Sequence, residues 1–204
     1  MSEKQQHWET VFTTKAVNEV SWYQSEPKTS IQLIQACKVT KDAKIIDIGG
    51  GDSYLIDSLL DLGYTNLFLL DISAAAIERA KIRLGAQAKN VTFIVSDSLH
   101  FQSNEKFDVW HDRASFHFFT EENDIEQYKA NVIANTNQNA HFIIGTFSED
   151  GPLKCSGLPI MQYSVEKMEA VFGADFELEN CFTEDHETPF DTVQNFIFCH
   201  YKKS

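Results

Sequence analysis

Five short apolar runs alternate with segments of helical periodicity between residues 44 and 147. The runs cover residues 45–48, 67–70, 91–95, 107–111 and 141–147. Continuous apolar runs of this length are typical of strands buried on both faces, as in parallel sheets. Apolar residues at helical spacing lie between several of these runs, at Leu55, Ile56 and Leu59, at Ile77, Ala80 and Leu84, and at Ile125, Tyr128 and Val132. The alternation predicts an α/β fold, a doubly wound, mostly parallel sheet with helices on both faces.

The two flanks follow different patterns. Residues 1–40 contain helical spacing at Trp8, Val11 and Phe12, and Pro27 is placed to start a second helix. Beyond residue 147, Ser164 can cap a short helix, and Thr120 can cap the helix before the fifth strand. Two extended runs, 176–182 and 193–201, then predict an antiparallel hairpin that closes one edge of the sheet.

A glycine-rich loop follows the first predicted strand, with the sequence Asp47-Ile48-Gly49-Gly50-Gly51. Glycine allows a sharp turn and a close approach of the backbone to a ligand. The helix that follows offers free N–H groups to an anionic group. The same loop could also be a tight strand-to-helix turn without a ligand.

Polar residues stand at the carboxyl ends of the other strands, where open doubly wound sheets bind their ligands. Asp71 ends the second strand, Asp97 follows the third, and His111-Asp112-Arg113 end the fourth. A carboxylate about 20 residues beyond a glycine loop suits a pair of ribose hydroxyls. Each acidic residue alone could be a helix cap, but together they indicate an adenosine-type ligand.

Composition excludes several classes of protein. The 204 residues carry a formal net charge of −13, which argues against a nucleic-acid partner because phosphate binding needs a basic face. The first residues lack the apolar segment of a signal peptide, and no apolar run reaches membrane length. The four cysteines show no spacing typical of a metal site, so no metal is expected. A cytoplasmic protein with reduced thiols is the expectation.

The loop and the strand-end residues resemble the class I S-adenosylmethionine-dependent methyltransferases. The resemblance implies a Rossmann-like, seven-stranded fold in one domain over 1–204: an N-terminal extension or lid (1–40), a cofactor-binding core (41–147) and a C-terminal helix and hairpin (148–204). It implies S-adenosylmethionine as cofactor, with its methionine part along Gly49 and Gly51. The implied cofactor-binding residues are Asp47, Gly49, Gly50, Gly51, Asp71, Ile72, Asp97, Ser98 and His111.

Two segments, Glu19-Val20-Ser21-Trp22-Tyr23-Gln24 and residues 111–118, resemble a small bacterial subgroup of this family without a settled substrate. The acceptor is expected to be a small molecule or a protein side chain. The family's Asn/Asp-Pro-Pro-aromatic motif for amino groups of nucleic acids is absent after the fourth strand. Candidate residues of the acceptor pocket are Trp22, Tyr23, Arg113 and Cys155, although Trp22, Tyr23 and Cys155 could equally pack in the core.

Methyl transfer from a sulfonium needs alignment and exclusion of water, and a general base only if the acceptor arrives protonated. His117 and His111 are the candidate bases, with a scaffold role as the alternative for each. Two other functions stay open. A nicotinamide-dependent oxidoreductase would need a third glycine where Tyr54 stands, and a non-catalytic module could bind an adenosyl ligand with the same fold.

Overall fold

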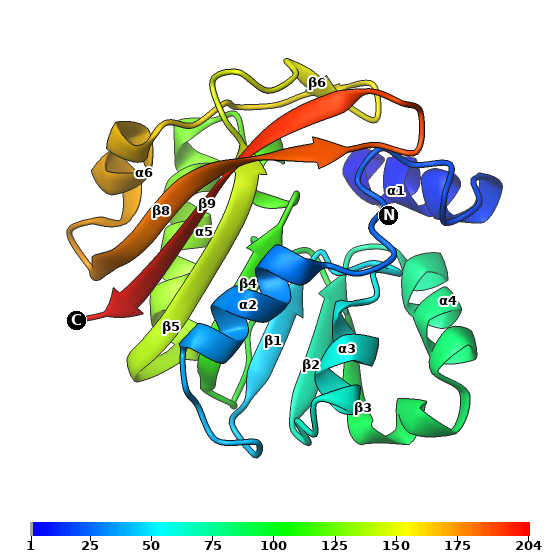
Figure 1. Ribbon diagram of the computed structural model, residues 1–204, viewed down its shortest axis with the longest axis horizontal. Helices are drawn as coiled ribbons and strands as arrows, with labels where there is room; N and C mark the ends of the chain where they lie inside the picture. The colour runs from blue at the N-terminus through cyan, green and yellow to red at the C-terminus, as the bar shows by residue number, and fades with distance from the viewer. Residues whose placement is uncertain (1) are drawn as a thin grey trace.

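A seven-stranded sheet forms the centre of the protein, whose computed structural model describes residues 2–204 (Figure 1). The strand order is β3-β2-β1-β4-β5-β9-β8, with β1 to β5 parallel and β9 antiparallel to both of its neighbours. This arrangement confirms the predicted fold class. The strands are β1 (Ile45–Ile48), β2 (Leu67–Asp71), β3 (Val91–Val95), β4 (Phe107–Arg113), β5 (Thr136–Phe147), β8 (Phe176–Glu187) and β9 (Val193–Lys203).

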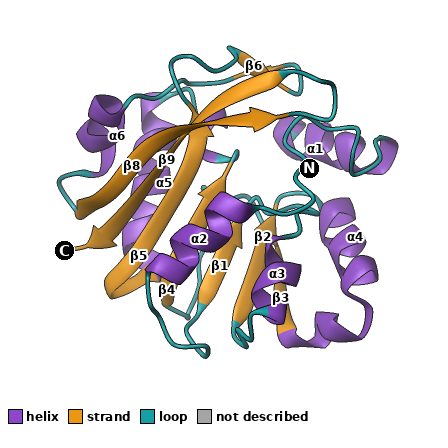
Figure 2. Cartoon of the chain, viewed as in Figure 1, coloured by secondary structure: helices purple, strands orange, loops and turns teal. Residues whose placement is uncertain are grey.

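Helices cover both faces of the sheet (Figure 2). Residues of α2, α3 and α4 join one apolar cluster with β1 and β2, and residues of α5 and α6 join the other with β4, β5 and β9. Because each face is covered, the central strands are buried on both sides, which is why they are continuous apolar runs. The helices are α1 (Glu3–Thr14), α2 (Lys28–Ala36), α3 (Leu55–Asp61), α4 (Ala74–Leu84), α5 (Glu122–Asn135) and α6 (Val165–Phe172), with 3₁₀ turns at Gly85–Asn90 and Phe116–Phe118.

Serine side chains cap three of the six α-helices in the described part of the chain, and the predicted cap at Ser164 is confirmed. Ser73 accepts a hydrogen bond from the amide of Ala76 at the start of α4, and Ser164 does the same for α6. The predicted cap at Thr120 is wrong, because α5 begins one residue later with Glu121 at the N-cap and no side-chain cap bond. The first turn of α5 instead contains two acidic residues, Glu122 and Asp124, whose negative charges interact favourably with the positive end of the helix dipole.

Helix α1 packs against α4 beside the carboxyl ends of β2 and β3 (Figure 1). Glu9 accepts hydrogen bonds from the Ser73 hydroxyl at 2.7 Å and from the Ala75 amide at 3.2 Å, so its charge lies at the positive end of α4. Arg79 of α4 donates in return to the carbonyl oxygens of Phe12 and Lys15 at the end of α1. These long-range bonds hold the N-terminal helix over the strand ends.

The expectation of reduced thiols is wrong for two of the four cysteines. The antiparallel register of β8 and β9 places Cys181 directly opposite Cys199, and the two form a disulfide with a Cα–Cα distance of 4.1 Å. Cys37 and Cys155 are free and buried. A separate two-stranded element, β6 (Lys154–Cys155) and β7 (Leu158–Pro159), lies between β5 and α6.

No helix among residues 2–204 combines the length and the apolar character that crossing a membrane requires.

A buried polar chain links the core to the end of β4. The indole nitrogen of Trp110 donates to the Tyr128 hydroxyl at 3.1 Å, and that hydroxyl donates to Asp112 Oδ2 at 2.6 Å. The second oxygen of Asp112 accepts from the amides of Ser115 and Phe116. Burial raises the pKa of Asp112 to about 6, while these hydrogen bonds oppose the shift. These hydrogen bonds fix the backbone where β4 leaves the sheet.

We predict that Tyr128→Phe lowers the free energy of unfolding by about 1–3 kcal/mol, because it removes a donor from a buried carboxyl group and an acceptor from a buried indole. The matched control is Tyr163→Phe, since the buried Tyr163 hydroxyl has no hydrogen-bond partner and its loss leaves no group unpaired. Urea unfolding measures both. Equal effects of the two variants would contradict a stabilising role for the Tyr128 hydroxyl.

Candidate functional site

An open cleft lies at the carboxyl ends of the parallel strands and has two adjoining lobes. Lobe A, of about 660 Å³, is lined by Asp71, Ile72, Asp97 and Ser98, among others. Lobe B, of about 580 Å³, is lined by Tyr23, Ser30, Asp47, the three glycines 49–51 and His111, among others. Phe12, Trp22, Gly49 and Arg113 line both lobes, so the two form one continuous site.

The glycine loop connects β1 to α3 along the floor of the cleft. Gly49 and Gly51 have positive φ angles of 61° and 53°, which side chains rarely adopt. A Cβ atom at Gly51 would come within 2.9 Å of the Phe12 ring, and one at Gly50 within 2.4 Å of Asp47 Oδ2. The loop therefore requires glycine both for its backbone angles and for the space around it.

Asp47, His111 and Ser30 form a buried hydrogen-bonded chain beneath lobe B. Asp47 Oδ1 lies 2.7 Å from His111 Nδ1, and His111 Nε2 lies 2.8 Å from the Ser30 hydroxyl. In the tautomer in which Nδ1 carries the proton, Nδ1 donates to Asp47 and Nε2 accepts from the Ser30 hydroxyl. The second oxygen of Asp47 is buried and has no partner within residues 2–204. These hydrogen bonds connect β1, β4 and α2 at the site.

Asp71 stands at the end of β2 with one oxygen bound to the protein. Its Oδ1 accepts from the Ser73 amide at 2.8 Å. Burial raises the pKa of Asp71 to about 7, and hydrogen bonds from the amides of Ser73 and Gly51 reduce that shift. The carboxyl group thus changes charge near neutral pH while it lines lobe A.

Asp97 and Ser98 form the far wall of lobe A after β3. Asp97 Oδ1 accepts from the amide of Leu99 at 3.0 Å, and the carbonyl of Ser98 accepts from the Asn131 side chain at 2.8 Å. The nearby carbonyl of Ile72 accepts from Gln5 at 3.3 Å. The structure therefore brings two pairs of residues from different strand ends into one lobe: Asp71 and Ile72 after β2, and Asp97 and Ser98 after β3.

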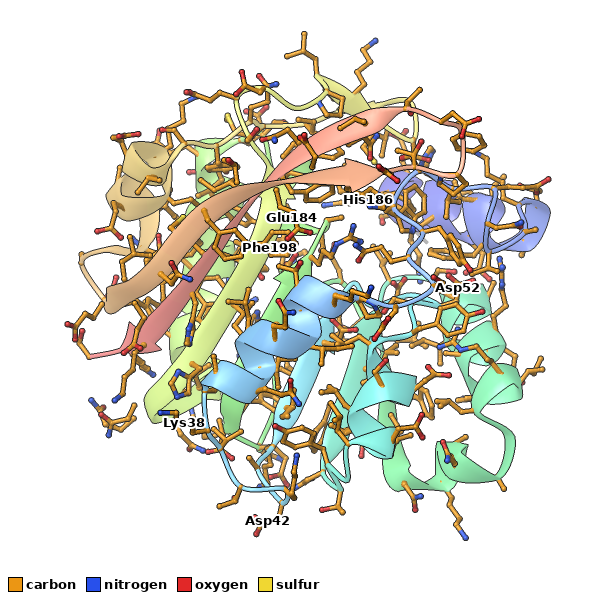
Figure 3. All side chains as sticks on the ribbon, in the orientation of Figure 1. Lys38, Asp42, Asp52, Glu184, His186 and Phe198 are labelled. Carbon is orange, nitrogen blue, oxygen red and sulfur yellow. A yellow bond between two sulfur atoms is a disulfide. The ribbon has the colours of Figure 1, made fainter. Side chains whose placement is uncertain are left out.

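Arg113 ends β4 between the two lobes. Its Nη1 donates to the carbonyl of Trp22 at 3.0 Å, and its guanidinium carbon lies 4.9 Å from the centre of the Phe196 ring. Its Nε is buried without a partner among the described residues. Burial lowers the pKa of Arg113 to about 10, although the charge of Glu184 on β8, labelled in Figure 3, acts in the opposite direction. Arg113 therefore contributes a positively charged side chain to the lining of both lobes.

The structure does not bring His117 or Cys155 into the lining of either lobe. His117 is fully buried, stacks on Phe147 with 4.5 Å between ring centres, and has no hydrogen-bond partner at either nitrogen among residues 2–204. Burial lowers its pKa to about 3, so the ring is neutral at physiological pH. Cys155 is also buried, and burial raises its thiol pKa to about 12. Trp22 and Tyr23, in contrast, do line the cleft.

Several residues that line the cleft were not among the predicted site residues. Lys4, Trp8 and Phe12 of α1 close lobe A, where Lys4 Nζ lies 4.1 Å from the centre of the Phe119 ring and Trp8 packs edge-on against Phe118. Ser30 reaches lobe B from α2. These residues precede the first strand, and only the docking of α1 on α4 reveals their position. An amphipathic N-terminal helix with aromatic residues was the one available hint.

The strand order and the cleft at the carboxyl ends define the class: this is the fold of the class I S-adenosylmethionine-dependent methyltransferases. Residues 39–194 match the protein family described as "Methyltransferase domain". Because this match covers more than half of the chain, the chain belongs to that family, and the predicted family is confirmed. The bacterial subgroup suggested by the two N-terminal and post-β4 segments stays a prediction.

Known proteins of this class resemble the chain in sequence or in fold. EEF1A lysine methyltransferase 2 of Danio rerio is 30% identical over 102 residues, 49% of this chain and 44% of that protein. The eEF1A lysine and N-terminal methyltransferase of Mus musculus is 28% identical over 93 residues, 45% of this chain and 13% of that protein. The chain therefore matches less than half the length of either relative. N-methyltransferase NodS from Bradyrhizobium japonicum, solved with S-adenosyl-L-homocysteine, shares the fold with a TM-score of 0.73 at 12% identity, with 99% of both chains covered.

We predict that His111→Leu lowers the free energy of unfolding by about 1–3 kcal/mol, because Asp47 and Ser30 both lose their buried partner. Ser30→Ala removes only the last bond of the chain and is expected to have a smaller effect. The control is His100→Leu, since the His100 side chain is 81% exposed. Chemical denaturation of the three variants gives the comparison. A His111→Leu protein as stable as the wild type would contradict the proposed hydrogen-bonded chain.

Proposed function

We propose that the protein transfers a methyl group from S-adenosylmethionine to a small-molecule or protein acceptor. The observation that carries this proposal is that Asp71 and Asp97 line the same lobe together with Gly49, the residue of the glycine loop that lines both lobes. Residues 41–147 would form the cofactor-binding core, and the N-terminal segment through residue 40 would form a lid. The lid is supported by the contacts of Trp8, Phe12 and Trp22 with the cleft.

The residues of the cleft fit this cofactor. Asp71 offers an acceptor toward lobe A and would hold the ribose hydroxyls, with Ile72 against the adenine and Asp97 and Ser98 at its edge. Gly49, Gly50 and Gly51 line lobe B, and the methionine part would lie along their backbone. Asp47 and His111 would complete lobe B. The donor group supplies an electrophilic methyl on a positively charged sulfur.

The protein's own contribution would be alignment and exclusion of water. The aromatic rings of Trp8, Phe12 and Trp22 cover the cleft and keep it apolar on one side. His111 is the remaining candidate base, and taking a proton would require it to release the Ser30 hydroxyl. We propose no proton transfer by His117, because it lies outside the lining of the cleft and stays neutral.

The acceptor would meet the donor where the two lobes join. Trp22 and Arg113 line both lobes, and Tyr23 lines lobe B. Burial raises the pKa of the Cys155 thiol, and the charge of Arg113 acts on it in the opposite direction. A protein lysine is one acceptor class, which the names of two relatives suggest. A small acceptor with an anionic group is another, since the Nε of Arg113 is free to donate.

Calorimetric titration with S-adenosylmethionine and S-adenosylhomocysteine tests the proposal, and we predict saturable binding of both. Asp71→Asn is expected to weaken binding by about 2–3 kcal/mol, because charge-assisted hydrogen bonds to the ribose are lost. Asp61→Asn is the matched control, since Asp61 is an exposed carboxylate of α3 that does not line either lobe. Absence of binding to the wild-type protein would overturn the proposal. Transfer of labelled methyl to a component of a cell extract would separate an enzyme from a binding module.

Ribose binding should depend on pH through Asp71. Its pKa of about 7 lies above the ordinary value, and the ionised form accepts two hydrogen bonds, so affinity should rise as pH increases and level off above about 7. The probe is 5′-methylthioadenosine, which keeps the adenosine part but lacks the titrating amino acid. We predict a loss of up to about tenfold per pH unit below 7. The same slope in Asp71→Asn would assign the effect to another group.

A further inference from the structure

A second cluster of reactive side chains lies at the opposite end of the sheet from the cleft. Cys37, His141 and His200 bring one sulfur and two imidazole nitrogens within 4.8 Å of one another. His141 pairs with Val109, which in turn pairs with Ile45, the first residue of β1. The cluster is therefore level with the amino ends of the parallel strands. Figure 3 labels Lys38, which follows Cys37 at the end of α2, and Asp52, which follows the glycine loop. The two lie far apart in that view.

Three separate elements position the cluster. Cys37 caps the end of α2, where Lys38 turns the chain away with a φ of 53°. His200 of β9 pairs with Ile143, while His141 of β5 pairs with Lys202, so the two histidines are diagonal neighbours on one face of the sheet. Helix α2 packs on β5 at this face. The sequence spacing could not show the site because its members are brought together by sheet pairing and helix docking.

The distances suit a tetrahedral metal ion. Cys37 Sγ lies 3.5 Å from His200 Nε2, and His141 Nδ1 lies 2.8 Å from the same nitrogen. With zinc bonds of about 2.0–2.1 Å to nitrogen and 2.3 Å to sulfur, ligand atoms in a tetrahedral site are about 3.3–3.6 Å apart. The sulfur–nitrogen pair already has this separation. The two nitrogens would need to open by about 0.5 Å, within the reach of small ring rotations.

The types of the three side chains also suit a metal, since imidazole nitrogen and cysteine sulfur are the ligands that zinc prefers in proteins. Cys37 and His200 are buried, whereas His141 is partly exposed and leaves a route to solvent. Glu179 is an exposed carboxylate on β8, the strand that pairs with β9 beside His200. It is the extra residue at the register shift between Leu178 and Asn180, a bulge opposite His200.

We propose that Cys37, His141 and His200 bind one Zn²⁺ ion, with a water molecule or Glu179 in the fourth position. On binding, the Cys37 thiol releases its proton to solvent, and the sulfur forms a bond to the metal without any change of oxidation state. A thiolate and a carboxylate together balance the charge of the ion. The site joins α2 to β5 and β9, and is independent of the cofactor cleft. It revises the expectation, drawn from cysteine spacing, that the protein holds no metal.

Cobalt(II) substitution tests the site directly. The tag-free protein, stripped of metal by a chelator and with its Cys181–Cys199 disulfide intact, is titrated with Co²⁺. We predict one ion per chain, with the intense visible bands of tetrahedral cobalt and a near-ultraviolet charge-transfer band from thiolate to cobalt. The charge-transfer band should disappear in Cys37→Ser and persist in Cys155→Ser, a matched control at the other buried free cysteine. Cobalt on acidic surface groups would give neither feature.

Thermal unfolding supplies a second readout that does not depend on activity. We predict that Zn²⁺ at a hundredfold excess over its Kd raises the Tm of the wild-type protein by about 5–10 °C. The shift should be lost in Cys37→Ser and in His141→Gln, while His100→Gln, at an exposed histidine, keeps it. Circular dichroism shows whether each variant folds. A charge-transfer band that survives in Cys37→Ser, or a wild-type protein that neither binds nor is stabilised, would overturn the proposal.

Discussion

Burial of carboxyl groups at the ends of three neighbouring strands is the constraint on which this structure depends. Asp47, Asp71 and Asp112 end or nearly end β1, β2 and β4 and are almost fully buried. A buried carboxyl group needs hydrogen-bond donors, and the protein supplies them from the His111 ring, the Ser73 amide and the Tyr128 hydroxyl. The positions of these donors around the three carboxyl groups determine the local structure of the cleft.

The donors are themselves held by more distant elements, which links the site to the rest of the fold. His111 is fixed by Ser30 of α2, and Tyr128 extends from α5 on the opposite face of the sheet. Glu9 of α1 binds the start of α4, next to Asp71. Helices from both faces and from the N-terminal segment therefore converge on the strand ends. The raised pKa values of Asp71 and Asp112 show that burial outweighs the hydrogen bonds there, and a polar ligand at Asp71 would offset that cost.

The parts of this arrangement that depend on local pattern could be predicted from the sequence. Apolar runs predict the parallel strands, and the position of Asp71 and Asp97 after two of them predicts one shared lobe, because parallel strands end at the same edge. Ser73 as a cap follows from its place before an apolar helix. The three glycines at positions 49–51 predict a tight loop. Two of them, Gly49 and Gly51, adopt the positive φ angles that glycine allows.

What depends on long-range packing could not be predicted. Lys4 and Trp8 reach the cleft only because α1 docks on α4, and Cys181 meets Cys199 only because of the register of β8 with β9. The cluster of Cys37, His141 and His200 joins three elements that no spacing rule connects. His117 is a candidate base from its sequence because the ordinary pKa of histidine is near neutrality, but the turn at Phe116–Phe118 directs its ring into the core.

A crystal structure with S-adenosylhomocysteine tests the central claim most directly. The account predicts the ribose hydroxyls within hydrogen-bond distance of the Asp71 carboxylate, the adenine between Ile72 and the Asp97–Ser98 wall, and the amino-acid end along the glycine loop. A ligand bound elsewhere, or one in this cleft with Asp71 turned away from the ribose, would contradict it.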